Sequence, residues 1–419
     1  MKKNIIGFGG LSHLSLAYAL ATTLKKYTVN IFDFDKKKIE DFLVNKINFN
    51  EENLLKFYKK QKKYINLSSN VELLKECEII FISLDVQTDD KNISDYSLIK
   101  KYLDYLDYNI SVNVPFVIQS QLYPGFCDRL KLNKSRDIYY HVETLVFGNA
   151  LERALKPERI IIGKANNKKI DKNYDKYLKQ FRCPVIQADY KSAELCKIAI
   201  NIFLSSSVTT ANIIANLCEK IGANYKYIFE AVKLDKRIGP NAYVSPGLGI
   251  SGGNIERDLR NLNNLLKENN INHDFIKSII KTSNESKNWL KNIFNDIYKK
   301  TNVKNVSIYG LSYKKDNSST KNSPTLSFLK EIKKYNLNVK IYDDLILRHK
   351  DYKIYQCPYM VAKKADILIL ARHFVKIDTI KKIFIKNKKI YILDPFGILS
   401  DILKDNERVK YYKIGKSNL

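Results

Sequence analysis

The sequence has little glycine and little cysteine, and each shortage excludes some functions. Of its 419 residues, 15 are glycine and 6 are cysteine. The cysteines are scattered along the chain, at Cys77, Cys127, Cys183, Cys196, Cys218 and Cys357. No two of them have Cys-x-x-Cys spacing, which argues against a zinc site and against a disulfide framework. We therefore expect no metal site and a reducing, cytoplasmic location.

Long apolar runs and a hydrophobic leader are also missing. We find no window of roughly eighteen uncharged apolar residues, so we expect no membrane-spanning helix. The N-terminal residues lead directly into a strand and a glycine cluster, and they lack the apolar segment and cleavage site of a secretory signal. Hydrophobic residues still make up 45% of the chain, which is enough to build packed cores.

Acidic residues are fewer than basic ones, 44 against 72, and the formal net charge is +28. Such a charge is found in proteins that bind nucleic acid or anionic membranes. The lysines, however, are spread along the whole chain with acids and asparagines between them, which is typical of a solvated surface. We therefore expect neither nucleic acid nor a membrane as a partner. Nucleic-acid binding stays an alternative, and salt-dependent DNA binding would reveal it.

Hydrophobic patterns divide the chain into three parts. Strand and helix patterns alternate in the first part, with strands expected at 4–6, 28–32, 78–84 and 114–120 and helices at 14–26 and 36–42. Such alternation predicts a parallel sheet covered on both faces. Helical patterns dominate from about residue 192 to 297, and strand patterns return at 306–309, 339–342, 367–370 and 390–393.

These patterns predict an α/β fold with three domains. The first is an N-terminal domain with a Rossmann-type parallel sheet (1–191), and the second is a central helical domain with a long connecting helix (192–300). The third is a smaller C-terminal Rossmann-like α/β domain (301–419).

A glycine cluster after the first strand predicts a dinucleotide site. Gly7-Phe8-Gly9-Gly10-Leu11-Ser12 follows a strand and opens a helix, as the Gly-x-Gly-x-x-Gly fingerprint requires, with Ser12 in place of the third glycine. Asp33 ends the second strand and would bind a ribose 2′-hydroxyl, which favours NAD over NADP. The predicted cofactor-binding residues here are Gly7, Gly9, Gly10, Leu11 and Asp33. The alternative is a Rossmann-like domain without a cofactor, and we expect His13 to pack rather than to act.

A second glycine cluster carries a resemblance to a known family. It reads Asp235-Lys236-Arg237-Ile238-Gly239, then Pro246-Gly247-Leu248-Gly249, then Gly252-Gly253-Asn254-Ile255-Glu256-Arg257-Asp258. In this order the segments resemble the signature of the UDP-glucose/GDP-mannose dehydrogenase family. Further similar segments are Ser120 to Gly125, Glu143 to Leu145, Pro157 to Gly163, Glu194 to Asn201, Gly310 to Lys314 and Lys321 to Pro324. The resemblance therefore spans nearly the whole chain.

The resemblance implies an enzyme that uses NAD to oxidise C6 of a nucleotide-linked hexose, for surface polysaccharide precursors such as those of a capsule. Family members oxidise the alcohol to the aldehyde and then to the acid. A cysteine thiolate traps the aldehyde as a thiohemiacetal, and the resulting thioester is hydrolysed by water. The first domain would bind NAD, the second would carry the reacting loop and a dimer helix, and the third would bind the nucleotide.

The sequence departs from this scheme at its centre. Asn254 stands where the family has the nucleophilic cysteine, and an amide cannot form a thioester. Gln121 replaces a threonine that the family uses to handle water, and Phe147 replaces a second glutamate. Glu143 alone remains of that glutamate pair. We therefore count Asn254 and Glu143 among the catalytic positions but expect the thioester chemistry to be lost.

The residues that the family uses for the first oxidation remain. Lys197 and Asn201 are four residues apart in a helical pattern and share one face. In the family this pair, with the aspartate that matches Asp258, holds the reacting oxygen and a water. A positioned cation stabilises the developing alkoxide, and the aspartate can accept the proton through water. The alternative is structural, with Lys197 a solvated side chain and Asn201 a buried hydrogen-bonding residue.

The resemblance also implies residues that bind the substrate. We expect phosphate and nucleotide contacts from Arg237, Gly249, Gly252, Gly253 and Lys314, and a contact from Lys321 that we assign to the cofactor. UDP-hexose is the expected substrate, although uracil and guanine are not distinguished. A homodimer on the long central helix is expected as well, although its apolar residues are equally compatible with an intramolecular core.

Three hypotheses follow. The first is a single oxidation, which would give an aldehyde, or a ketone if the sugar is held differently. The second is a full oxidation to the acid by a non-covalent route. The third is a non-catalytic homologue that binds NAD and the nucleotide sugar, and the retained Lys197, Asn201 and Asp258 argue against it.

Overall fold

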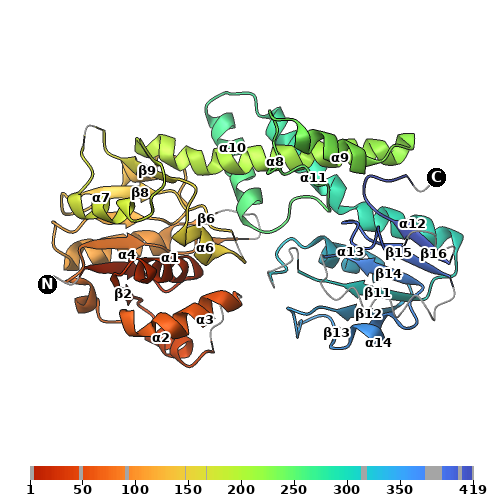
Figure 1. The fold of residues 1–419 in the computed structure, drawn as a ribbon, viewed down its shortest axis with the longest axis horizontal. Helices are drawn as coiled ribbons and strands as arrows, with labels where there is room; N and C mark the ends of the chain where they lie inside the picture. Colours follow the sequence, from red (N-terminus) through yellow and green to blue (C-terminus); the bar gives the residue numbers. More distant parts are fainter. Residues whose placement is uncertain are drawn as a thin grey trace. The chain divides into compact units, whose positions relative to one another are not determined.

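A computed structural model describes residues 4–46, 51–89, 94–146, 148–166, 168–312, 319–372, 389–403 and 408–417 (Figure 1). The chain divides into two compact units, Met1–Ile200 and Asn201–Leu419. The division falls inside one long helix, α8 (Tyr190–Ile221). The three domain boundaries expected from the sequence therefore stay a prediction.

The first unit is built on an eight-stranded sheet. Its strands, in spatial order, are β10 (Val185–Ala188), β9 (Ile160–Lys164), β8 (Ile138–His141), β7 (Phe116–Ile118), β4 (Ile79–Ile82), β1 (Ile5–Gly9), β2 (Thr28–Phe32) and β3 (Ile65–Ser68). All neighbours are parallel except β8 and β9, which are antiparallel. The predicted Rossmann-type parallel sheet is confirmed, with this one antiparallel pair added.

Helices cover both faces of this sheet. Alternate residues of β1 enter two separate cores, Ile6 and Phe8 on one face and Ile5 on the other. The first core is completed by α1 (His13–Leu24), α2 (Lys36–Leu43), α3 (Glu52–Gln61), α6 (Ala150–Leu155) and α7 (Lys172–Lys179). The second is completed by α4 (Ser97–Asn109), α5 (Phe126–Arg129) and the start of α8. A short antiparallel ribbon, β5 (Gln87–Thr88) and β6 (Ser94–Asp95), lies outside the sheet.

The strand order predicts that a ligand binds beside β1. The chain runs from β1 outward to β2 and β3 and then returns to β4 on the other side of β1. Ligands of open α/β sheets bind at the carboxyl ends of the strands at such a reversal. Ser12 caps the helix that begins there: its side chain accepts a hydrogen bond from Ser15 N, and the Ser15 side chain bonds the Ser12 backbone in return.

The second unit begins with helices, as the sequence predicts. After α8 come α9 (Tyr225–Leu234), α10 (Asn254–Glu268), α11 (Asp274–Lys287) and α12 (Trp289–Lys300). One cluster joins α10 to α11 and to α8, through Leu259, Ile276, Ile279 and Ile202. Between residues 201 and 304, all of which the structure describes, no strand forms.

Helix α8 has the length and apolarity of a membrane span. Its most apolar window has a mean hydropathy of 1.5, and 39% of that window is buried inside the structure. Of the helices in the described ranges it is the one that meets this test, and a single such helix is weak evidence because core helices of soluble proteins meet it as well. Its buried polar residues include Ser205, Thr209 and Asn212. The expectation that the chain does not enter a membrane stays a prediction.

The second unit ends in a six-stranded, fully parallel sheet. Its strands, in spatial order, are β13 (Ile354–Tyr355), β12 (Asn338–Tyr342), β11 (Asn305–Tyr309), β14 (Ile367–Leu370), β15 (Ile390–Leu393) and β16 (Val409–Tyr412). One face packs on α12 and α13 (Pro324–Ile332), and the other packs on α14 (Pro358–Ala362). The predicted smaller α/β domain is confirmed.

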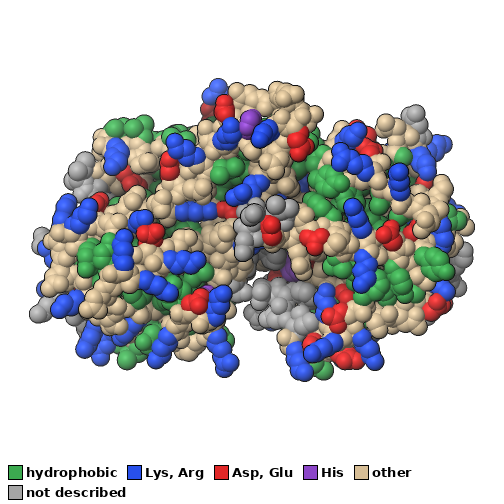
Figure 2. Space-filling view, turned by 180° about the vertical axis from the view of Figure 1, so that it is seen from behind, with side chains coloured by type: hydrophobic (Ala, Val, Ile, Leu, Met, Phe, Trp, Pro, Cys, Tyr) green, Lys and Arg blue, Asp and Glu red, His purple; other side chains and the backbone are tan. Residues whose placement is uncertain are grey.

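Basic side chains are dispersed on the face drawn in Figure 2. Lysine and arginine occur over both units there, and acidic side chains lie among them. Exposed pairs of opposite charge also occur along the helices: Lys36 and Glu40, one turn apart on α2, have 3.8 Å between Nζ and Oε1. This face shows a mixed, solvated surface rather than one continuous basic stripe.

Candidate functional site

The dinucleotide crevice of the first unit is organised around Asp33, the residue that follows β2. Its side chain is buried, and Oδ2 accepts hydrogen bonds from the Leu11 backbone N–H at 2.7 Å and from Lys38 Nζ at 3.1 Å. Its Oδ1 accepts the backbone N–H of Asp35 at 3.0 Å. The predicted residues Leu11 and Asp33 are therefore in direct contact.

The glycine loop between β1 and α1 fits a bound dinucleotide. Gly10 has a φ of 95°, and a Cβ there would lie 2.0 Å from Leu84 Cδ2, so only glycine fits. Gly7 lies inside β1 rather than in the turn, paired with Asn30 of β2 and Ile80 of β4, and a Cβ there would lie 2.9 Å from Ile80 Cγ1. The loop thus leads into the N-terminus of α1, where backbone N–H groups attract phosphate.

Two predicted catalytic residues form an ion pair in the first unit. Lys197 Nζ on α8 lies 3.2 Å from Glu143 Oε2 on the loop after β8. Both side chains are nearly buried, with exposed fractions of 11% and 14%. Glu143 also accepts the backbone N–H of Leu145. Lys197 is therefore held by a carboxylate and is not a solvated helix side chain.

Two other predicted catalytic residues meet in the second unit. Asn201 Nδ2 donates a hydrogen bond of 2.5 Å to Asp258 Oδ2, and both residues are buried. Asp258 Oδ1 lies 3.7 Å from Arg257 Nε, so the carboxylate keeps a cation nearby. Lys197 and Asn201 are one turn apart on α8, which places both on the same face of that helix.

Asn254 stands at the start of the helix that carries Asp258. It is exposed and is the first residue of α10, and Gly253 is the N-cap. Asp258 is four residues later, so the two side chains share one face of α10. Within the second unit, Asp258 thus bonds Asn201 and lies one turn after Asn254 on α10; we refer to these three residues as the group of Asn254.

The glycine loop before α10 is tied to the C-terminal domain. Gly252 N donates to Lys321 O at 3.2 Å, and Asn322 Nδ2 donates to Gly252 O at 3.2 Å. A Cβ at Gly253 would lie 3.5 Å from Lys321 Nζ, so this ammonium covers the loop. Glu256 joins the contact, because it accepts from Asn322 and from Lys287 Nζ, the latter at 2.5 Å.

Comparison with known proteins identifies the family. Three family models match the chain in order: the NAD binding domain at residues 1–181, the central domain at 191–285 and the UDP binding domain at 307–401 of the UDP-glucose/GDP-mannose dehydrogenase family. The chain belongs to the UDP-glucose/GDP-mannose dehydrogenase family. It is therefore an NAD-dependent oxidoreductase that acts on a CH–OH group of a nucleotide sugar.

Relatives match over nearly their whole length. The chain is 26% identical over 442 residues to the UDP-glucose 6-dehydrogenase of Rickettsia felis, covering 98% of this chain and 96% of that one. It is 27% identical over 397 residues to the UDP-glucose 6-dehydrogenase of Campylobacter jejuni, covering 92% and 98%. These relatives support the family assignment at the level of sequence.

Solved structures share the fold. A UDP-D-ManNAc dehydrogenase from Pyrococcus horikoshii superposes with a TM-score of 0.84 at 18% identity, covering 99% of this chain and all of that chain. A UDP-glucose dehydrogenase from Pyrobaculum islandicum superposes with a TM-score of 0.82 at 17% identity, covering 99% of this chain and 98% of that chain. At this identity the likeness establishes the architecture of the dehydrogenase.

The remaining predicted residues of this dehydrogenase have different surroundings. Gly249 has a φ of 75°, and a Cβ there would lie 2.3 Å from Ser283 O, so the loop requires glycine. Arg237 is highly exposed, and among the described residues its side chain bonds Asp235 of the same turn, at 2.6 Å and 3.0 Å. Lys314 and Phe147 lie outside the described residues.

Thiols do not accompany Asn254 within the second unit. The two cysteines of that unit are Cys218, which packs with Ala211, Ala215 and Tyr225, and Cys357, which precedes α14. Neither belongs to the group of Asn254. In the first unit, burial raises the pKa of Cys77 to about 12 and raises that of Cys127 as well. These two thiols are therefore protonated and unreactive near neutral pH.

Sequence reasoning missed several residues of the site. Lys38 pairs with Asp33. The only signal for this pair in the sequence was that Lys38 follows Asp33 by five residues. The C-terminal sheet repeats the arrangement of Asp33, because Asp343 Oδ2 accepts the Leu311 N–H at 2.7 Å. Arg372, buried at the end of β14, pairs with Asp343 and Asp344. No motif marked this arginine.

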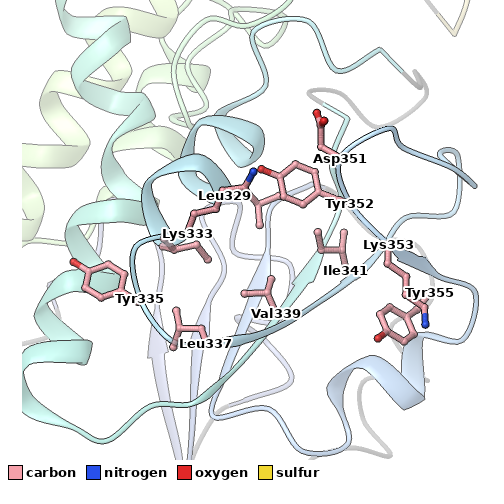
Figure 3. A pocket seen from close by; sticks show the side chains of 11 residues that line it. Leu329, Lys333, Tyr335, Leu337, Val339, Ile341, Asp351, Tyr352, Lys353 and Tyr355 are labelled. Carbon is pink, nitrogen blue, oxygen red and sulfur yellow. The ribbon is translucent and has the colours of Figure 1, made fainter.

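A separate cavity of about 300 Å³ lies on the C-terminal sheet (Figure 3). Its lining includes Leu329 of α13, Lys333 directly after that helix, Val339 and Ile341 of β12, and Tyr352. The Nζ of Lys333 lies 5.3 Å from the centre of the Tyr352 ring. None of the predicted site residues lines this cavity, so it is not part of the reacting site.

Proposed function

We propose that this dehydrogenase oxidises the C6 alcohol of a UDP-hexose once and releases the aldehyde. The observation that carries the proposal is the group formed by Asn201, Asp258 and Asn254. The Asn201–Asp258 hydrogen bond of 2.5 Å keeps the parts for alcohol oxidation in place. On the same face of α10, an amide stands where family members carry their nucleophilic thiol.

The retained residues supply what alcohol oxidation needs. When NAD is bound, it supplies the acceptor for the hydride that leaves C6. The Lys197 ammonium stabilises negative charge on the C6 oxygen, and Glu143 at 3.2 Å orients it. The hydroxyl proton passes to a water held by Asn201 and Asp258, with the carboxylate as the base. Gly7, Gly9, Gly10, Leu11, Asp33 and Lys321 are the proposed cofactor-binding residues.

Asn254 explains why the reaction stops at the aldehyde. An amide nitrogen is a poor nucleophile, so it forms neither the thiohemiacetal nor the thioester that the second oxidation uses. The cysteines of the second unit lie in other contacts, in the Cys218 cluster and before α14. The competing outcome is a slow, non-covalent route to the acid, in which water hydrates the aldehyde and the hydrate is then oxidised.

The substrate is proposed to bind across the second unit. Gly249, Gly252 and Gly253 form the loop proposed to approach the diphosphate, although the Gly252 N–H is already donated to Lys321 O. Arg237 and Lys314 supply charge for the diphosphate. Arg372 is a further candidate, because it is buried at the carboxyl ends of the C-terminal strands.

We propose a cytoplasmic homodimer that makes surface polysaccharide precursors, for example for a capsule. Helix α8 leaves several apolar side chains exposed, namely Phe203 (76%), Ile213 (53%), Leu217 (54%) and Ile221 (66%). An apolar row of this size on one helix suits a self-complementary interface. The dispersed surface lysines do not favour nucleic acid as a partner.

Counting NADH against sugar tests the proposal. Purified enzyme is incubated with NAD and a panel of UDP- and GDP-hexoses, and NADH formed is divided by sugar consumed. One NADH per sugar supports the single oxidation. Two NADH with an acid product would show the non-covalent four-electron route instead. Tight binding of NADH and a UDP-hexose without turnover would show a non-catalytic homologue.

A further inference from the structure

A buried hydrogen bond links the dinucleotide loop to a distant part of the first unit. His13 is the first residue of α1, directly after the glycine loop and its cap Ser12. Its Nε2 lies 2.8 Å from Oε2 of Glu51, the residue before α3. The exposed fractions of the two side chains are 10% and 4%. Packing alone would not require an acid opposite this histidine.

Glu51 also holds the start of α6. Its Oε1 accepts the backbone N–H of Ala150, the first residue of that helix, at 2.9 Å. Burial by itself would raise the pKa of Glu51, but the hydrogen bonds from His13, Ala150 and Gly148 outweigh it and leave the pKa below its usual value. Glu51 is therefore an ionised carboxylate with donors from two separate segments.

Helix α1 also contacts the other end of the same loop. Burial raises the pKa of the Tyr18 hydroxyl, the charge of Glu143 raises it further, and a hydrogen bond with the Thr144 backbone opposes both. The Tyr18 ring meets His141 edge to face, with 5.8 Å between centroids. The end of the Glu143 loop is thus linked to His13 of α1 through Glu51 and the Ala150 N–H, and Tyr18 of α1 packs on His141 just before the loop begins.

We propose that His13, Glu51 and Tyr18 are positioning residues that couple NAD binding at α1 to the placement of Glu143. This proposal rests on the proposed role of Glu143 and Lys197 at the reacting oxygen. The backbone N–H groups at the N-terminus of α1 would hold the pyrophosphate of bound NAD. Ordering of that helix end then orders both attachments of the Glu143 loop.

The consequence concerns Lys197. Its ammonium is oriented by Glu143 at 3.2 Å, so a displaced Glu143 loop would leave the cation poorly placed toward the substrate. Catalysis depends on sub-ångström placement of such groups. Loss of the coupling should lower kcat more than it weakens NAD binding, because the three positioning residues do not themselves form the cofactor site.

Hydrogen exchange on the intact enzyme tests the coupling. The amides of residues 143–146 and 148–150 are followed with and without saturating NAD, in the wild type, Tyr18→Phe and Glu51→Gln. Tyr177→Phe is the matched control, since it also removes a buried tyrosine hydroxyl bonded to α1, at 3.0 Å from Thr22 Oγ1, but away from the loop. Glu51→Gln keeps the size of the side chain, and Tyr18→Phe keeps the ring. If only one of the two variants folds, that variant alone is enough to test the coupling.

We expect NAD to slow exchange in these amides in the wild type and in Tyr177→Phe. In Tyr18→Phe and Glu51→Gln the NAD-dependent slowing should be lost, while the Kd for NAD changes less than about threefold and kcat falls about tenfold or more. Equal slowing by NAD in all four proteins would overturn the coupling. The exchange measurement needs no turnover. The coupling can therefore be overturned while the single oxidation stands, and the single oxidation can be overturned while the coupling stands.

Discussion

Asn201 and Asp258 are joined by a hydrogen bond of 2.5 Å although 57 residues separate them in the chain. Asn201 belongs to α8 and Asp258 to α10, and the bond is buried. The amide nitrogen of Asn201 can only donate, so it fixes Asp258 Oδ2 as an acceptor and orients the carboxylate. This is the arrangement that a water-mediated base requires.

Replacing that carboxylate should abolish most of the activity. Asp258→Asn keeps the size of the side chain but removes the base, so we expect kcat to fall by about 100-fold to 10,000-fold. NAD binding, which involves the first unit, should be unchanged. Asp274→Asn on α11 is the control, because its carboxylate is exposed and, among the described residues, pairs with Lys277 of the next turn. Unchanged turnover in Asp258→Asn would exclude it as the base.

Asp33 should decide between the two nicotinamide dinucleotides. Its buried carboxylate repels a 2′-phosphate, so Asp33→Asn should weaken NAD and improve NADP relative to NAD by about tenfold or more in kcat/KM. Lys38, 3.1 Å away, would then be available to the phosphate. Steady-state kinetics with both cofactors measure the ratio. Asp41 is half-buried on α2 and pairs with Lys46 at 3.7 Å. Asp41→Asn is the control that removes a carboxylate from α2, the helix that also carries Lys38, and the cofactor ratio should not change in it.

A single substitution should restore the missing half-reaction. Asn254→Cys places a thiol at the start of α10, four residues before Asp258, where the helix N-terminus favours the thiolate. We expect NADH per sugar to rise above that of the wild type and a uronic acid to form. Asn254→Ser is the matched control and should stay at the wild-type value. A cysteine variant that still yields only aldehyde would show that Gln121 and Phe147 also block the second step.

Acid should destabilise the first unit through His141. Burial lowers the pKa of this histidine to about 4, and its Nδ1 lies 2.9 Å from the Tyr174 hydroxyl. The unfolded chain binds this proton near pH 6.5, so stability is complete above about pH 6.5 and falls by about 3 kcal/mol as the pH drops to about 4. Urea unfolding across this range should show a shallower pH slope for His141→Gln. His273→Gln at the start of α11 should keep the wild-type slope.

The sequence predicted the elements whose signals are local. The strand expected at 28–32 matches β2 residue for residue, since its apolar run is bounded by Lys26-Tyr27 and Asp33. The glycine loop, Asp33 and the helical part from 192 to 297 could be predicted because their signals also lie in neighbouring residues of the sequence. The described structure confirms the α/β class and both sheets.

What the sequence could not give depends on pairing between distant segments. The antiparallel contact of β8 with β9 has no sequence signal, because both strands are buried on two faces and read as plain apolar runs. The His13–Glu51 bond spans 38 residues, and a single histidine after the fingerprint reads as a packing residue. Lys197 and Glu143 were both singled out, but only the fold showed that they form an ion pair.

The mass of the released sugar nucleotide tests the central claim most directly. The wild-type enzyme is incubated with NAD and its preferred UDP-hexose, the product is trapped with hydroxylamine, and the mixture is analysed by mass spectrometry. We predict an oxime of the C6 aldehyde, derived from a sugar two hydrogens lighter than the substrate. A product carrying an added carboxyl oxygen and no oxime would contradict the claim that Asn254 stops the reaction after one oxidation.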